Sequence, residues 1–129
     1  MKFILDTSAY SAFNRGDNRL QPLFQSKNSI IVPLIVVGEL RAGFAAGTKV
    51  GENEKLLQRF LDAPNVQALT ITDATTQRFA EVYLGLRSAD TPIGTNDMWI
   101  AALTLEHEAP LLTLDRDFAF VPNIKLVTI

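Results

Sequence analysis

Four carboxylates are the residues of this sequence best placed to do chemistry. Asp6 directly follows the apolar run KFIL, and Asp115 follows APLLTL, with Asp117 close behind. Asp97 opens a helical pattern, and Glu39 lies within VVGELRAG. A carboxylate in such a place can cap a helix, close a turn or hold a metal ion, and its neighbours decide between these roles.

Glu39 has the neighbours that most favour a functional role. The residues three and four positions away on the expected helix are Ile35, Val36, Ala42 and Gly43, all apolar or small. None of them is Lys or Arg, so no ion pair can form within the helix. A carboxylate on an apolar face must be paired, protonated or bound to a metal, because burying it alone costs much free energy.

Asp6, Asp97 and Asp115 each have an ordinary structural interpretation when taken singly. Asp6 reads as a helix cap, Asp97 as a first-turn acid favoured by the helix dipole, and Asp115 as a turn residue. Together with Glu39 they would raise one another's pKa values by repulsion unless a cation neutralised them. Oxygen ligands suit Mg²⁺ or Mn²⁺, and Mg²⁺ usually combines one or two carboxylates with phosphate oxygens, which points to phosphoryl chemistry.

Short apolar runs alternate with helical patterns along the whole chain. The apolar runs predict five strands, at 2–5, 29–32, 67–72, 109–114 and 124–129. The helical patterns lie at 8–16, 20–27, 33–47, 51–63, 73–89 and 95–109. Such alternation is typical of a parallel sheet covered on both faces. We therefore predict one α/β domain over residues 1–129, a three-layer α/β/α fold with a central, mostly parallel sheet of four or five strands.

The predicted topology brings the carboxylates to one edge of the sheet. In open α/β sheets, ligands bind beyond the carboxyl ends of the strands. Asp6 and Asp115 follow strands, Glu39 lies two turns into the helix after the second strand, and Asp97 opens the helix that leads to the fourth. We expect a shared acidic site at this edge.

Several helix ends carry recognisable signals. Gly16 is suited to the position just after a helix, where a left-handed backbone is common. We expect Asp73 to cap the helix 73–89, and Thr95 or Asn96 to cap the helix 95–109.

Composition limits the class of protein. The chain has 129 residues, a net charge of −2 and no cysteine, which excludes disulfides, thiolate metal sites and cysteine nucleophiles. FIL is too short for the core of a signal peptide, and the longest apolar run, IIVPLIVVG, is about half a membrane span. We expect a cytoplasmic protein with no membrane partner. The single histidine, His107, cannot supply a pair of acid–base groups, which favours hydrolysis by a metal-activated water.

Four segments together resemble a known family. Four segments resemble, in order and spacing, the four motifs of the PIN-domain ribonucleases: LDTSAYSAF, VVGELRAG, GTNDMWIAA and LLTLDRDF. In length and in the sequence of these motifs, the chain is similar to the VapC-like toxins of type II toxin–antitoxin systems. The resemblance implies that the metal ligands and catalytic residues are Asp6, Glu39, Asp97 and Asp115. It implies Mg²⁺ or Mn²⁺ as the cofactor. The supporting residues that it implies are Thr7, Ser8, Thr113 and Asp117.

The same resemblance implies an activity and partners. The expected activity is metal-dependent endoribonuclease cleavage, acting on tRNA or another structured RNA. The expected partners are the RNA substrate, a cognate antitoxin protein whose C-terminal segment lies across the groove, and a second copy of the chain in a homodimer. An alternative is a catalytically silent PIN-like subunit that only binds protein.

An acidic protein can still bind RNA through a local basic rim. Without the four proposed ligands, ten of the fourteen acids remain against twelve Lys and Arg. The candidate RNA-binding residues near the motifs are Arg15, Arg41, Arg87 and Arg116. Trp99 and Tyr10 are candidates for stacking on bases, although Trp99 within MWIAAL is more typical of a core residue.

Other α/β classes fit less well. A phospho-acceptor receiver domain would carry an acidic pair after the first strand and a Lys after the fifth, whereas Asp6 is followed by Thr7 and Lys125 lies within the last predicted strand. A haloacid-dehalogenase-type phosphatase requires D-x-D where this chain has DTS. A Rossmann dehydrogenase requires a Gly-rich turn, and LDTSAYS has no glycine.

Overall fold

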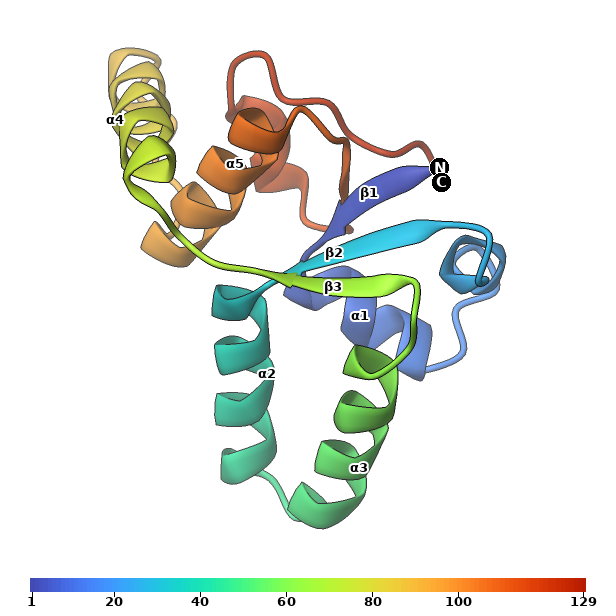
Figure 1. Ribbon diagram of the computed structural model, residues 1–129. Coiled ribbons are helices and arrows are strands. Elements are labelled where there is room, and N and C mark those ends of the chain that lie inside the picture. The colour runs from blue at the N-terminus through green and yellow to red at the C-terminus, as the bar shows by residue number, and fades with distance from the viewer.

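The computed structural model describes residues 1–129, and a fully parallel, four-stranded sheet lies at its centre (Figure 1). The strands are β1 (Lys2–Leu5), β2 (Ser29–Pro33), β3 (Val66–Leu69) and β4 (Leu111–Leu112), in the order β3-β2-β1-β4. Ile4 of β1 pairs with Ile31 on one side and with Leu111 on the other. The first strand in the sequence therefore lies inside the sheet, between β2 and β4.

Helices cover both faces of this sheet. The α-helices are α1 (Thr7–Asn14), α2 (Leu34–Ala46), α3 (Val50–Leu61), α4 (Asp73–Ser88) and α5 (Thr95–His107), and the 3₁₀ helices are η1 (Gln21–Phe24) and η2 (Arg116–Phe120). Figure 1 shows α1, α2 and α3 on one side of the sheet and α4 and α5 on the other. The predicted three-layer α/β/α fold is confirmed.

The two central strands form the middle of the hydrophobic core. Phe3, Ile4, Leu5, Ile30 and Val32 are fully buried. A strand covered on both faces needs apolar side chains at successive positions, which explains the unbroken runs KFIL and SIIV. Burial of each large side chain contributes roughly 1.5–3 kcal/mol, so β1 and β2 are firmly held where they end beside Asp6.

The last two predicted strands are much shorter than expected. The segment 109–114 forms only the two-residue β4, and the prediction of a fifth strand over 124–129 is wrong, because only an isolated bridge joins Leu126 to Leu111. A two-residue strand offers no room for a longer partner. The predicted strand 67–72 begins at Val66 and ends at Leu69, and the predicted helix 20–27 is the 3₁₀ helix η1.

The helix ends confirm one prediction and correct two. Gly16 follows α1 with a φ of +88°, a backbone region that favours glycine. Thr72, rather than Asp73, is the N-cap of α4. Gly94, rather than Thr95 or Asn96, precedes α5, so no side chain caps that helix.

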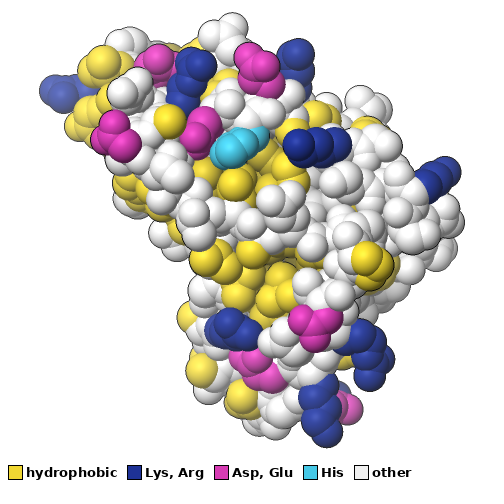
Figure 2. Space-filling view, viewed as in Figure 1, with side chains coloured by type: hydrophobic (Ala, Val, Ile, Leu, Met, Phe, Trp, Pro, Cys, Tyr) yellow, Lys and Arg dark blue, Asp and Glu magenta, His cyan; other side chains and the backbone are white.

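The surface shows where the two halves of the molecule meet. Figure 2 shows apolar side chains in a hollow between the α4–α5 half and the α2–α3 half. No helix is long and apolar enough to cross a membrane.

Candidate active site

The candidate site lies where the order of the strands reverses. The chain moves from β1 to β2 and β3 on one side, and then returns to place β4 on the other side of β1. In open α/β sheets this switch point, at the carboxyl ends of the strands, is the usual place for a ligand. Asp6 leaves β1 there, and Thr113 leaves β4.

Asp6 is buried and is held by three donors. It caps α1, because its Oδ1 accepts a hydrogen bond of 2.9 Å from the amide of Ala9. The Ser8 hydroxyl donates to Oδ1 at 2.8 Å, and the Thr113 hydroxyl donates to Oδ2 at 2.5 Å. Burial raises the pKa of Asp6, the hydrogen bonds from Thr113, Ala9 and Ser8 oppose that rise, and Asp115 adds to it. Asp6 is thus both a helix cap and a member of the acidic group.

Glu39 projects from α2 and is tied to the start of α1. The Thr7 hydroxyl donates a hydrogen bond of 2.9 Å to Oε1 of Glu39. No Lys or Arg pairs with this carboxylate, and Arg41, the nearest cation along the helix, instead bonds to Glu54 on α3 at 3.2 Å. The absence of a local ion pair agrees with the sequence pattern around Glu39.

Asp97 lies in the first turn of α5, and every other acid of the group affects its pKa. Burial, followed by the negative charges of the other carboxylates, raises its pKa from 3.8 to about 6; those carboxylates are Asp115, Glu39, Asp6 and Asp117, in decreasing order of effect. Repulsion of this kind requires that the acids lie near one another. The fold therefore brings together the four carboxylates that lie far apart in the sequence.

A polar cavity opens beside Asp97. It has a volume of about 370 Å³ and is lined by Glu39, Gly94, Thr95, Asn96 and Asp97, with no hydrophobic residue. Such a lining suits a phosphate, a sugar or hydrated ions better than a nucleobase. Thr95 and Asn96 were predicted only as caps, and their place in the cavity wall has no signal in the sequence beyond their closeness to Asp97.

Asp115 and Asp117 begin the helix η2. Oδ1 of Asp115 accepts a hydrogen bond of 2.9 Å from the amide of Asp117 and so caps η2. Asp117 is exposed and has the weakest effect among the acids that raise the pKa of Asp97. Asp115 therefore belongs to the centre of the group and Asp117 to its rim.

The donor chemistry of this group fits a hard divalent cation. All the candidate ligands are carboxylate or hydroxyl oxygens, and cysteine is absent. The side chains do not converge as three or more Asp, Glu or His around one point. That arrangement still suits Mg²⁺, which commonly uses one or two carboxylates and completes its shell with water and phosphate oxygens.

The predicted RNA contacts fare unevenly. Arg15, Arg87 and Arg116 are exposed and form no ion pair, whereas Arg41 is engaged with Glu54. On the face shown in Figure 2, Lys and Arg side chains are scattered rather than gathered into one patch. A basic rim at this site therefore stays a prediction.

Both aromatic candidates pack against another aromatic ring. Tyr10 is only 2% exposed and packs against Phe60, with ring centroids 5.2 Å apart. Trp99 is stacked on Phe79 of α4 at 4.0 Å, in keeping with a packing role. The interpretation of Tyr10 as a stacking residue is wrong, because the residue four positions after Asp6 on α1 points into the core.

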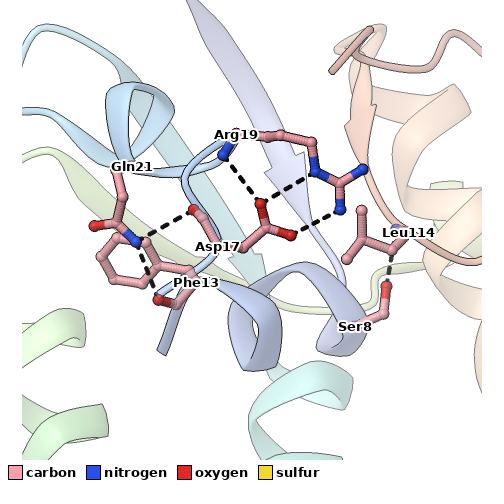
Figure 3. A network of polar contacts seen from close by, with 6 residues as sticks. All are labelled: Ser8, Phe13, Asp17, Arg19, Gln21 and Leu114. Atoms are coloured by element: carbon pink, nitrogen blue, oxygen red, sulfur yellow. Dashed lines mark hydrogen bonds and ion pairs between the residues drawn. The ribbon is translucent and has the colours of Figure 1, made fainter. Parts of the chain in front are cut away.

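Two further polar contacts were not predicted. The Ser8 hydroxyl accepts a hydrogen bond of 3.0 Å from the amide of Leu114, and the guanidinium of Arg19 forms a two-bond fork with Asp17 (Figure 3). A backbone amide has no sequence signature, so the first contact could not be found without the fold. The fork is a D-x-R pattern in an exposed loop, and such surface pairs are common.

Comparison with known proteins identifies the family. The family model of the PIN domain matches residues 3–123. Ribonuclease VapC4 of Mycobacterium tuberculosis is 31% identical over 98 residues, which cover 76% of this chain and 75% of that protein. The chain belongs to the PIN-domain family and, more particularly, to the VapC toxin family of VapBC toxin–antitoxin systems. Its distant homologues are VapC ribonucleases, and PIN nucleases typically depend on a metal ion.

Solved structures share the fold along almost their whole length. VapBC2 from Rickettsia felis, bound to a DNA fragment from its promoter, gives a TM-score of 0.84 at 27% identity and 98% coverage of both chains. VapBC-5 from Mycobacterium tuberculosis, a member of the VapBC family of toxin–antitoxin systems, gives 0.76 at 23% identity, with 99% of this chain and 98% of that chain covered. Toxin–antitoxin complexes are thus the structural neighbours of this protein.

Proposed function

We propose that this protein is a metal-dependent endoribonuclease and the toxin of a toxin–antitoxin pair. The observation that carries the proposal is the polar cavity that Glu39 and Asp97 line together, where burial and four other acids raise the pKa of Asp97 to about 6. A fold that brings several carboxylates together at a switch point, beside a cavity without apolar lining, is suited to a cation and a phosphate group.

Each residue has a distinct part in the proposed site. Asp6, Asp97 and Asp115 would hold Mg²⁺ or Mn²⁺, directly or through water. A bound ion supplies a water of lowered pKa and offsets charge on the scissile phosphate. Glu39, held by Thr7 and facing the same cavity as Asp97, orients the attacking water as a hydrogen-bond acceptor.

The proposed reaction is hydrolysis of one phosphodiester bond. The water oxygen bonds to phosphorus and loses a proton, the bond from phosphorus to the 3′ oxygen breaks, and that oxygen takes up a proton. The products are a 5′-phosphate and a 3′-hydroxyl. Loops of tRNA or of another structured RNA are the proposed substrate, because their splayed bases are accessible.

Cleavage of RNA by matched variants tests the proposal. The purified protein is incubated with total cellular RNA and Mg²⁺, and new 5′-phosphate ends are mapped by ligation and sequencing. We expect Asp6→Asn and Asp97→Asn to abolish the new ends, and Asp73→Asn, an acid in the first turn of another helix, to leave them unchanged. Undiminished cleavage by both site variants would refute the site, and a folded wild-type protein that cleaves nothing would favour the catalytically silent alternative.

We also propose that the chain binds a cognate antitoxin and forms a homodimer. The solved VapBC structures support the first, since the chain shares their fold. Exposed apolar side chains on α4, at Tyr83 and Leu84, are available for contact with a second copy. Light scattering after size-exclusion chromatography, with the chain alone and co-expressed with the product of an adjacent gene, measures both. A strict monomer at high concentration would refute the homodimer.

A further inference from the structure

We propose that Ser8 is a positioning residue that fixes the loop 113–115, and with it Asp115, against Asp6. This inference rests on the proposed function, because it concerns the geometry of the proposed metal site. It assigns the two hydroxyl groups nearest to Asp6, those of Ser8 and Thr113, to the support of carboxylates and not to contact with a phosphate.

The backbone of the loop 113–115 has few hydrogen bonds to the sheet. The strand before it, β4, has only two residues, and the last backbone hydrogen bond between this strand and the end of β1 is a 3.3 Å contact from the amide of Asp6 to the carbonyl of Leu112. Beyond that point the amides of the loop bond to hydroxyl groups. The Leu114 amide donates to Ser8 Oγ at 3.0 Å (Figure 3), and the Asp115 amide donates to Thr113 Oγ1 at 2.9 Å.

Both hydroxyls donate their only proton to Asp6. Ser8 Oγ lies 2.8 Å from Oδ1 and 3.0 Å from Oδ2 of Asp6, and Thr113 Oγ1 lies 2.5 Å from Oδ2. A hydroxyl group has one O–H, so a group that donates to Asp6 has no proton left for a phosphate oxygen. Each hydroxyl also accepts a hydrogen bond from an amide of the loop. Ser8 and Thr113 are therefore links between a carboxylate and the loop.

Ser8 is the link that reaches the backbone of the loop from α1. Thr113 lies in the loop and its side chain reaches Asp6, whereas Ser8 lies in the first turn of α1, which Asp6 caps. Its hydroxyl joins residues that are 106 positions apart. Removing that hydroxyl leaves the amide of Leu114 without a partner and takes one donor from Asp6. The bond from Thr113 to Asp6 is then the only side-chain hydrogen bond that still ties the loop to Asp6.

Three variants on α1 separate this role from a general structural one. Ser8→Ala removes the link, and alanine favours a helix more than serine, so α1 itself is not weakened. Ser8→Thr keeps the hydroxyl. Ser11→Ala is the matched control, because Ser11 is half-buried on the same helix and its side chain forms no hydrogen bond.

Hydrogen exchange and Mn²⁺ titration measure the effect without RNA. In Ser8→Ala, the amide of Leu114 is expected to exchange roughly 5- to 10-fold faster, as the loss of one hydrogen bond implies. The affinity for Mn²⁺ is expected to fall roughly 10- to 100-fold, as is typical when a group that supports a metal ligand is removed. Ser8→Thr restores both values. In a separate assay at saturating Mn²⁺, the KM of Ser8→Ala for RNA stays unchanged.

The outcomes separate this proposal from the proposed function. If Ser8→Ala matches Ser11→Ala in both exchange and Mn²⁺ affinity, Ser8 is not a positioning residue. If Ser8→Thr folds but does not restore them, the hydroxyl is not the cause. A wild-type protein that binds Mn²⁺ but cleaves no RNA refutes the ribonuclease function, while the exchange and affinity results still decide the role of Ser8. A wild-type protein that binds no Mn²⁺ overturns both proposals.

Discussion

Replacing Asp97 by Asn tests whether the carboxylates of the site repel one another electrostatically. In the folded chain, burial and the neighbouring acids raise the pKa of Asp97 from 3.8 to about 6. An acid whose pKa is raised on folding binds protons more tightly in the native state, so stability falls as the pH rises through this window. The destabilising effect is small near pH 4 and complete above about pH 6.

The magnitude follows from the size of the pKa change. A rise of about two in pKa corresponds to at most about 3 kcal/mol. Asp97 is only half-buried, so solvent screening reduces the effect to about 1 kcal/mol. For a domain of this length, about 1 kcal/mol shifts the melting temperature by about 3–4 °C.

The same substitution removes the favourable interaction between an acid in the first turn and the helix dipole. This loss lowers the stability of the fold by roughly 0.3–1 kcal/mol. Asp73→Asn shares that loss, because Asp73 lies in the first turn of α4, but it does not raise the pKa of Asp97. The difference between the two variants therefore isolates the effect of the acidic group.

The assay is thermal unfolding of the wild type and both variants in excess EDTA, at several pH values from about 4 to about 7.5, the window set by the two pKa values. We expect Asp97→Asn to melt about 3 °C above Asp73→Asn at the upper end, and the gap to close at the lower end. Added Mg²⁺ should stabilise the wild type more than Asp97→Asn. A difference in melting temperature that does not change with pH would refute electrostatic repulsion among the carboxylates.

Three further predictions concern other parts of the molecule. Tyr10→Phe is expected to leave the stability unchanged or raise it by about 1 kcal/mol in a denaturant titration, because the buried hydroxyl has no hydrogen-bond partner; a clear loss of stability would show that the hydroxyl is bonded. Gly16→Ala should lower the stability by roughly 1–2 kcal/mol, since its φ of +88° is strained for a residue with a side chain, and an unchanged denaturation midpoint would contradict this backbone. Arg116→Ala, next to Asp115, should raise the KM for RNA in steady-state cleavage with little effect on kcat. Arg41→Ala should change the KM less, because Arg41 is paired with Glu54. Equal effects of the two substitutions on KM would contradict this difference.

The central strands could be predicted closely, whereas the strand at the β4 edge of the sheet could not. Residues 2–5 form β1 as predicted, and β2 adds only Pro33 to the predicted run, because strands buried on both faces need unbroken apolar sequence. The segment 124–129 has the same kind of apolar pattern but remains a single bridge. Its pairing depends on the length of β4, and that length is set by hydrogen bonds that turn the chain away after Leu112.

In the candidate site, too, some features could be predicted from the sequence and others could not. The placement of Asp6 and Asp97 at one edge follows from topology, since parallel strands end together and the helix before β4 starts at that edge. The isolation of Glu39 from cations was visible in its neighbours. The support that Ser8 gives to Leu114 was not visible, because a backbone amide carries no residue identity. Tyr10 was misjudged because its side chain was assigned to the surface when α1 turns it inward.

The carboxylates of the proposed site are spread from residue 6 to residue 115, and Asp115 follows a strand that adds to the far side of β1. Because the chain is made from its N-terminus, β1, β2 and β3 are synthesised before β4. The acidic group cannot assemble until that last strand has left the ribosome and docked. Under the proposed function, the chain therefore has no active site during most of its own synthesis.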